Sequence, residues 1–222
     1  MDYETLRPFF IWPHGLFGGA VLLSGAVAVA TKKGSPVHIK AGLVFYWTMI
    51  AALVAAVPLM LMTGNTFLLG LTPLSAYLVI AGRRTVRRRK TGQKVLAPFD
   101  RALALVVALA SAALAAYGVY GMSKGSDFGI VAIALGGIGV WMAGADFKNR
   151  DKKPERATEY LEQHIGYMVG AFIAATTAFS SINLGRIDAI PTWLTWLWPT
   201  VLGTAAITVF TNRIKNRGKK KR

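Results

Sequence analysis

Long runs of apolar residues alternate along the chain with short polar connections. The runs cover residues 9–30, 41–62, 66–81, 102–122, 128–145, 165–184 and 193–210. Each run has roughly 16 to 22 residues, and about 20 helical residues cross a hydrocarbon core of about 30 Å. No run alternates with the period of two that a barrel strand needs. The pattern therefore predicts an all-α bundle of seven transmembrane helices, in which residues 1–222 form a single integral membrane domain.

The basic residues are sorted between the connections. Taken alternately, one set of connections holds 23 of the 26 Lys and Arg residues and the other set holds three. Because basic side chains accumulate on the cytoplasmic side of a membrane, this sorting predicts an external N-terminus and a cytoplasmic C-terminus. It also predicts multi-pass insertion in the cell inner (plasma) membrane. The basic run 83–90 and the tail 217–222 would then face anionic phospholipid rather than nucleic acid.

Composition agrees with a membrane protein and narrows its chemistry. Hydrophobic residues make up 54% of the chain and the mean hydropathy is +0.44, which is too apolar for a water-soluble core. The absence of cysteine excludes disulfides, thiolate metal sites and covalently attached c-type haem. The first ten residues lack a basic n-region, so a cleaved signal peptide is not expected.

The apolar runs lack residues that several classes of membrane protein need. No ionisable residue lies at the middle of any run, which argues against ion-coupled pumps, proton relays and voltage sensors. The chain has no Walker loop, GxSxG elbow or HExxH motif. The sequence therefore does not decide whether the protein is an enzyme.

Two histidines introduce apolar runs in the same way, as His38-Ile39 and His164-Ile165. Ser35 and Pro36 are typical of the N-cap and the first residue of a helix, which places His38 in a first helical turn. Both histidines are expected at the cytoplasmic interface. His14 lies near the outer end of the first run, more than roughly 15 Å away at about 1.5 Å per residue. His38 and His164 are therefore the candidate cofactor-binding pair.

Three interpretations of this pair stay open. The two imidazoles could ligate a b-type haem axially, since facing helices commonly hold cofactors in bundles. With Asp146, at the inner end of the fifth run, they could instead hold a divalent metal ion with two imidazoles and one carboxylate. Each histidine could also simply bond a backbone carbonyl or a lipid phosphate. The first two interpretations make the protein a haem- or metal-binding component of membrane electron transfer.

Two other functions are compatible with the sequence. If the first three and last three runs form parallel halves around an inverting fourth run, the protein would be a small-solute carrier or sensor of the 3+1+3 type. Polar residues in the outer half of the sixth run would line its pocket or bond neighbouring helices; they are Thr176, Thr177, Ser180, Ser181 and Asn183. The other alternative is a non-catalytic accessory subunit or assembly factor of an oligomer or larger membrane complex.

Glycines predict where helices pack closely, because small residues let helix backbones approach. GxxxG pairs occur at Gly15 and Gly19 and again at Gly166 and Gly170, and the fifth run holds Gly136, Gly137, Gly139 and Gly144. We therefore expect the first, fifth and sixth helices at the tightly packed centre.

Several short motifs, which together cover most of the chain except its last run, carry a family resemblance. They are His14-Gly15, Ser24-Gly25, Lys33-Gly34-Ser35 followed by His38 and Gly42, Gly82-Arg83-Arg84, Ala145-Asp146, and His164 with Met168 and Asn183. The chain resembles an uncharacterised bacterial polytopic membrane-protein family catalogued as a domain of unknown function. The resemblance implies no firm activity. It marks His14, His38, Arg84, Asp146 and His164 as the positions to test.

The same family is loosely reminiscent of membrane cytochromes b. This chain lacks the two inner and two outer histidines that a two-haem protein would require. Any haem would accordingly be a single one at the inner interface.

Overall fold

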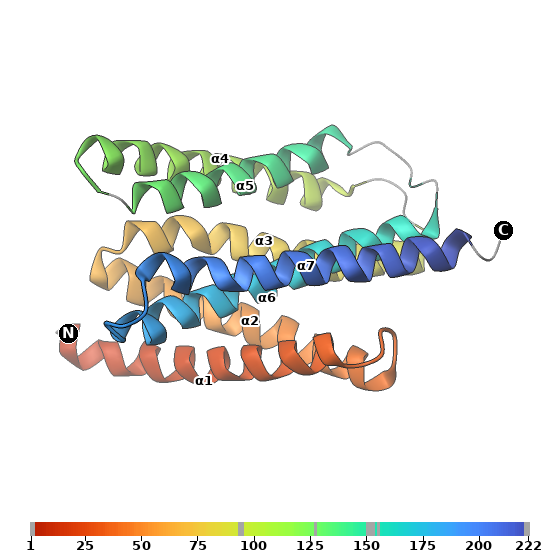
Figure 1. Cartoon of the computed structure of the whole chain (residues 1–222), viewed down its shortest axis with the longest axis horizontal. Coiled ribbons are helices and arrows are strands. Elements are labelled where there is room, and N and C mark those ends of the chain that lie inside the picture. Colours follow the sequence, from red (N-terminus) through yellow and green to blue (C-terminus); the bar gives the residue numbers. More distant parts are fainter. Residues whose placement is uncertain (1–2, 93–95, 127, 150–153, 155, 220–222) are drawn as a thin grey trace. The chain divides into compact units, whose positions relative to one another are not determined.

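Seven long α-helices make up the computed structural model, which describes residues 3–92, 96–126, 128–149, 154 and 156–219 (Figure 1). The helices are α1 Tyr3–Ala30, α2 Pro36–Thr63, α3 Thr66–Thr91, α4 Pro98–Ser123, α5 Gly129–Lys148, α6 Ala157–Asn183 and α7 Thr192–Lys219, with a short 3-10 helix, η1 Leu184–Arg186, before α7. No strand occurs among these residues. All seven helices are long and apolar enough to cross a membrane. The all-α, seven-helix prediction is confirmed.

The helices extend beyond the apolar runs that predicted them. The third run ends at Ala81, yet α3 continues through the basic run to Thr91. The seventh run ends at Phe210, whereas α7 continues to Lys219. Arg and Lys are good helix formers and the helical backbone needs no membrane to pair its polar groups, so the end of the apolar run does not end the helix. The last three residues of the basic tail, 220–222, lie outside the described residues.

Side-chain oxygens satisfy the exposed N–H groups at three helix starts. Ser35 Oγ accepts from the His38 N–H at 3.2 Å, which confirms Ser35 as the N-cap of α2. Asn65 Oδ1 accepts from the Leu68 N–H at 3.0 Å at the start of α3. Asp100, three residues into α4, reaches back to the Ala97 N–H at 3.2 Å. These caps fix where α2, α3 and α4 begin.

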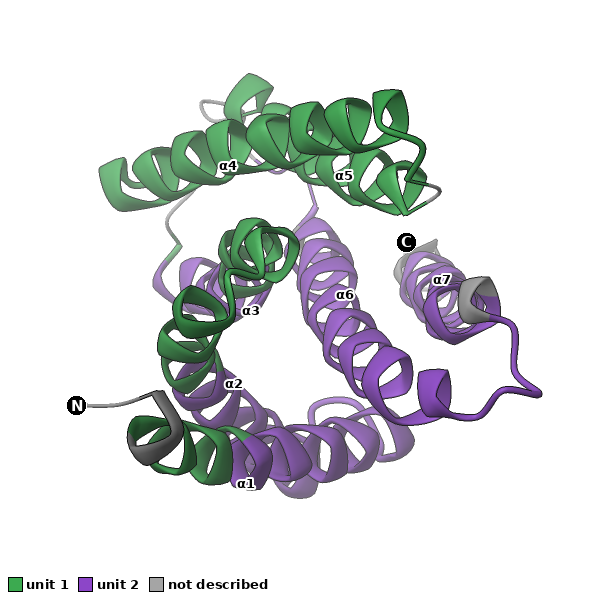
Figure 2. Cartoon of the chain, turned by 90° about the vertical axis from the view of Figure 1, so that its left-hand side faces the viewer, with its two compact units in different colours: residues 1–14, 53–77, 92–153 green, residues 15–52, 78–91, 154–222 purple. Residues whose placement is uncertain are grey.

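The chain forms two compact units, coloured separately in Figure 2. Unit 1 comprises residues 1–14, 53–77 and 92–153, and so contains α4 and α5 whole. Unit 2 comprises residues 15–52, 78–91 and 154–222, and contains α6, η1 and α7 whole. The first three helices contribute residues to both units.

Unit 1 is organised around the close packing of α4 against α5. A Cβ at Gly136 would lie 2.5 Å from the carbonyl oxygen of Ser111 and 2.7 Å from the backbone N of Ala115. A Cβ at Gly139 would collide with the Ser111 side chain, and one at Gly118 would lie 2.6 Å from the Gly129 carbonyl oxygen. Glycine at these positions allows two helix backbones to touch. Gly136 and Gly139 of the fifth run therefore mark a helix contact, as predicted, whereas a Cβ at Gly137 or Gly144 would meet no described atom within 4 Å.

The GxxxG pair of α1 behaves differently. A Cβ at Gly15 or Gly19 would meet no atom within 4 Å, and neither would one at Gly166 of α6. The expectation that these three glycines mark tight helix contacts within the chain is wrong. Gly170 does face a neighbour, since its Cβ would lie 3.5 Å from a Leu78 methyl group. The GxxxG spacing alone does not tell which glycines lie at a contact between helices.

In unit 2, α6 contacts several neighbours through its middle. The Phe172 ring meets Phe45 of α2 edge to face with centroids 6.2 Å apart, and it also fills the space beside Gly25 of α1. Ile173 occupies the space beside Gly203 of α7. Trp198 Nε1 of α7 donates to Ser180 Oγ at 2.8 Å. These contacts seat α6 among α1, α2 and α7.

We expect Ser180→Ala to destabilise the protein by roughly 0.6–1.7 kcal/mol, because the indole N–H of Trp198 would lose its acceptor in a low-dielectric setting. Ser181→Ala is the matched control, since the Ser181 hydroxyl bonds only its own helix at the Ala178 carbonyl oxygen, 3.0 Å away. Unfolding in mixed micelles, followed by tryptophan fluorescence, measures both variants. Equal losses for the two would contradict the interhelical role of Ser180.

Candidate functional site

The polar ends of five helices meet at one end of unit 2, which we call the basic end. Lys33, between α1 and α2, places its ammonium 4.3 Å from the centre of the Phe210 ring of α7. Arg88 of α3 donates to Gln163 Oε1 of α6 at 3.4 Å. Lys215 of α7 lies 3.6 Å from Glu162 Oε2 of α6. Residues from four separate connections are thereby brought to the same end of this unit.

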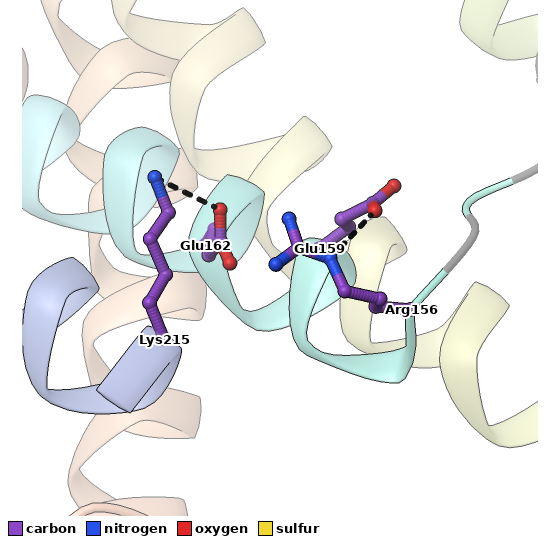
Figure 3. A network of polar contacts seen from close by, with 4 residues as sticks. All are labelled: Arg156, Glu159, Glu162 and Lys215. Carbon is purple, nitrogen blue, oxygen red and sulfur yellow. Dashed lines mark hydrogen bonds and ion pairs between the residues drawn. The ribbon is translucent and has the colours of Figure 1, made fainter. Parts of the chain in front are cut away.

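Figure 3 shows the acidic side chains of this end. Glu159 and Arg156 form an ion pair at 3.3 Å within the first turn of α6. Glu162 pairs across to Lys215, whose side chain is 43% exposed. Exposed pairs of this kind stabilise little, so they orient α6 and α7 more than they strengthen the fold.

His164 projects from α6 onto the backbone of α3. Its Nδ1 lies 2.8 Å from the carbonyl oxygen of Gly82. Because a carbonyl oxygen can only accept, Nδ1 must carry the hydrogen, and the lone pair of the ring is left on Nε2. Within the described residues, no hydrogen bond to Nε2 of His164 is found.

Gly82 makes this contact possible. A Cβ there would lie 2.6 Å from Met168 Sδ and 3.2 Å from the Cβ of Tyr167, both on α6. A larger residue at this position would require the Met168 side chain to move and would crowd the Cβ of Tyr167. The glycine therefore sets the distance between the two helices at the height of the imidazole.

His38 makes a parallel contact with α1. Its Nδ1 lies 3.0 Å from the carbonyl oxygen of Ala28, which belongs to the last turn of α1 and so lacks an intrahelical partner. Lys33 Nζ donates to the same oxygen at 3.1 Å. Burial lowers the pKa of the Lys33 ammonium. In its neutral form, His38 therefore also has its hydrogen on Nδ1 and its lone pair on Nε2.

The two imidazoles therefore have the same tautomer and are held by the same kind of partner. Both histidines belong to unit 2. A histidine that ligates a metal almost always donates its other ring N–H to a carbonyl or carboxylate, which fixes the ring and raises its basicity. Both rings meet that condition. The chemistry of the donor set fits an axial ligand pair.

Two buried polar atoms at this end have no hydrogen-bond partner among the described residues. They are Arg88 Nε and Glu162 Oε1. Buried polar groups are nearly always paired, so an unpaired one indicates a place that water, an ion or a ligand completes. Gln163, which bonds Arg88, and Glu162 directly precede His164 on α6. The orphaned atoms therefore lie at the basic end of unit 2, which also contains both histidines.

Asp146 has a different partner from the one the sequence suggested. The buried Tyr77 donates its hydroxyl hydrogen to Asp146 Oδ2 at 2.7 Å, and both residues belong to unit 1. The described residues contain no group of three His, Asp or Glu side chains placed to hold a metal ion. The three-ligand site of His38, His164 and Asp146, like the cofactor-binding pair of His38 and His164, stays a prediction.

The other candidate residues are distributed over both units. His14 belongs to the part of α1 in unit 1. Arg84 is half-buried on α3 in unit 2, two residues after Gly82. Asn183, at the exposed end of α6, donates to the Phe179 carbonyl oxygen of its own helix at 2.8 Å.

The polar face of α6 consists largely of local bonds. Thr176 donates to the Phe172 carbonyl oxygen of its own helix at 2.8 Å, and Ser180 accepts from Trp198. Of these bonds, the one between Trp198 and Ser180 joins α6 to another helix.

Fold and site together define a multi-pass α-helical membrane protein that contacts lipid and carries a pair of oriented imidazoles. Comparisons with protein-family models, curated proteins and solved structures find no match. The resemblance to a bacterial membrane-protein family therefore stays a prediction.

Sequence reasoning missed the partners that orient the site. Ala28 and Gly82 contribute backbone oxygens, which every residue has, so no residue type could identify them. Gly82 was noticed only as part of a motif. The signal that could have found it is a glycine at the point where an apolar helix becomes basic, opposite a histidine on another helix.

Proposed function

We propose that the protein is a component of membrane electron transfer that holds a b-type haem through Nε2 of His38 and Nε2 of His164. The observation that carries this proposal is the shared tautomer: each Nδ1–H is bound to a backbone carbonyl, at 3.0 Å and 2.8 Å, which leaves Nε2 as the only ring lone pair. Haem iron when bound would supply one-electron redox chemistry.

Haem is favoured over a bare metal ion by the number of protein ligands. A divalent ion such as zinc takes three or four protein ligands, whereas a six-coordinate haem needs only two, because the porphyrin supplies the other four. His38 and His164 offer two imidazoles. The described residues contain no group of three His, Asp or Glu side chains placed to hold a metal ion. The absence of cysteine restricts the haem to the non-covalent b type.

The chain's own residues would orient and tune such a group. The Ala28 and Gly82 carbonyls hold the two rings against rotation and make them better electron donors. Arg88 Nε is a buried donor that an anionic group on the ligand would satisfy. Lys33 and Phe210 tie α7 to the connection that precedes His38.

The membrane placement is the second part of the proposal. The N-terminus is external, the C-terminus is cytoplasmic, and the host is the inner (plasma) membrane. Sorting of the basic residues supports this orientation, and the gathering of four basic segments at one end of unit 2 agrees with it. The basic end then faces the anionic phospholipid of the cytoplasmic leaflet.

Visible absorption of the purified protein tests the haem proposal. We expect a Soret band that shifts and sharpens on reduction with dithionite, and iron in a stoichiometric ratio to the chain by metal analysis. Protein made in haem-limited cells should acquire the band when titrated with haemin. A preparation that shows neither iron nor a Soret band after haemin is added would overturn the proposal.

A further inference from the structure

Arg83 lies where the apolar part of α3 becomes basic, and its guanidinium packs against aromatic rings of α2. The guanidinium carbon is 4.6 Å from the centre of the Tyr46 ring and 5.9 Å from that of the Trp47 ring. All three residues belong to unit 2. Trp47 is 58% exposed. The cation therefore rests on an aromatic surface at the edge of the unit.

The hydrogen-bonding edge of this guanidinium is open. Within the described residues the two rings are the only recorded partners of Arg83, and no carboxylate or carbonyl oxygen accepts from it. Stacking covers the flat faces of a guanidinium but leaves its five N–H donors pointing outward in the plane. By contrast, Arg88 already donates to Thr85 Oγ1 at 3.1 Å and to Gln163.

The exposed residues beside the cation are both basic and apolar. Arg87 follows Arg83 by one turn of α3, and Lys40 precedes Trp47 by two turns of α2, so each lies on the same face as its partner. Leu43 and Val44, which lie between Lys40 and Trp47 on α2, are 40% and 49% exposed. Trp and Tyr rings favour the level of the lipid headgroups. Basic groups and exposed apolar side chains at the same place match the phosphate and the acyl chains of a phospholipid.

We propose that Arg83, stacked on Tyr46 and Trp47 and flanked by Arg87 and Lys40, binds the phosphodiester of one anionic phospholipid. The guanidinium edge donates to the phosphate oxygens, and the acyl chains lie along the exposed apolar residues of α2. This inference names the residues behind the lipid contact in the proposed function and rests on that part of it. It is independent of haem.

Native mass spectrometry of the full chain in detergent tests the site with phosphatidylglycerol and phosphatidylcholine as probes. We expect phosphatidylglycerol to bind more tightly, and Arg83→Ala to weaken that binding at least about tenfold, as the loss of charge-assisted hydrogen bonds predicts. Trp47→Leu should weaken it severalfold because the guanidinium loses its support.

Arg89→Ala is the matched control. Arg89 is exposed on α3 but lies on another face of the helix, six positions after Arg83, and its removal changes the net charge equally. We expect it to alter binding less than about twofold. Equal losses for Arg83→Ala and Arg89→Ala would overturn the site while leaving a general attraction of anionic lipid intact. Equal binding of the two lipids would overturn the assignment of an anionic phospholipid to this site.

Inorganic phosphate distinguishes the two sources of the anion. We expect millimolar phosphate to leave bound phosphatidylglycerol in place, because the phosphate ion gains nothing from the apolar surface of α2. Displacement by phosphate would show a free-anion site and overturn the lipid assignment.

Discussion

His164→Ala is expected to remove the Soret band from the purified protein, and His38→Ala to do the same. Each substitution deletes one axial ligand, so the loss of haem affinity should exceed the roughly 10–100-fold that changes in the surrounding hydrogen bonds cost. The measurement is a haemin titration followed at the Soret maximum, with parallel metal analysis. His14→Ala is the control, because it removes the same side chain from unit 1.

Added imidazole distinguishes the loss of a haem ligand from a disturbance of helix packing in His164→Ala. If His164 is a ligand, free imidazole should enter the space left by alanine and restore a large part of the band, since the iron needs only a ring nitrogen. A purely structural role for His164 would leave the band insensitive to imidazole. A full Soret band in both His38→Ala and His164→Ala, or equal losses in His14→Ala, would contradict the proposed pair.

Gly136→Ala is expected to destabilise the protein by about 1–3 kcal/mol, which is the usual range for overpacking a close contact. The added Cβ would lie 2.5 Å from the Ser111 carbonyl oxygen and 2.7 Å from the Ala115 backbone N. Both are backbone atoms of α4, so no side-chain rotation relieves the clash and α5 must move away. Reversible unfolding in mixed micelles, followed by circular dichroism, gives the free-energy difference.

The neighbouring position supplies the control. Gly137→Ala adds the same methyl group to the same helix, but its Cβ would meet no atom within 4 Å. We expect this variant to keep its stability or to gain up to about 1 kcal/mol, because alanine is a better helix former than glycine. Equal stability of the two alanine variants would show that the α4–α5 contact at Gly136 has no special role.

The number of helices could be predicted from the sequence because hydropathy and backbone pairing are local properties. A run of about 20 apolar residues that must satisfy its own backbone groups in lipid has few alternatives to a helix. The N-cap at Ser35 was predictable for the same reason, since its partner is three residues away. The ends of α3 and α7 were less predictable, because both helices continue past their apolar runs into basic residues. Hydropathy locates the end of an apolar run and not the end of the helix.

Helix contacts could be predicted only in part. The glycines at 136 and 139 pack tightly, and those at 15 and 19 meet nothing within the chain, although the two patterns resemble each other. A glycine permits a close approach without specifying which helix approaches it. That choice depends on the shapes of the neighbouring side chains, such as Ser111 beside Gly139.

By itself, the sequence determined that His38 and His164 introduce two apolar runs of a seven-helix membrane protein without cysteine. Only the tertiary structure decided what each ring contacts, and hence which nitrogen keeps its lone pair. The partner of His164 is a backbone oxygen 82 positions away, and Asp146 is paired with Tyr77, 69 positions away. The physical reason is that helix formation depends on residues close along the chain. The tautomer of an imidazole depends instead on the acceptor that the packing of other helices places beside the ring.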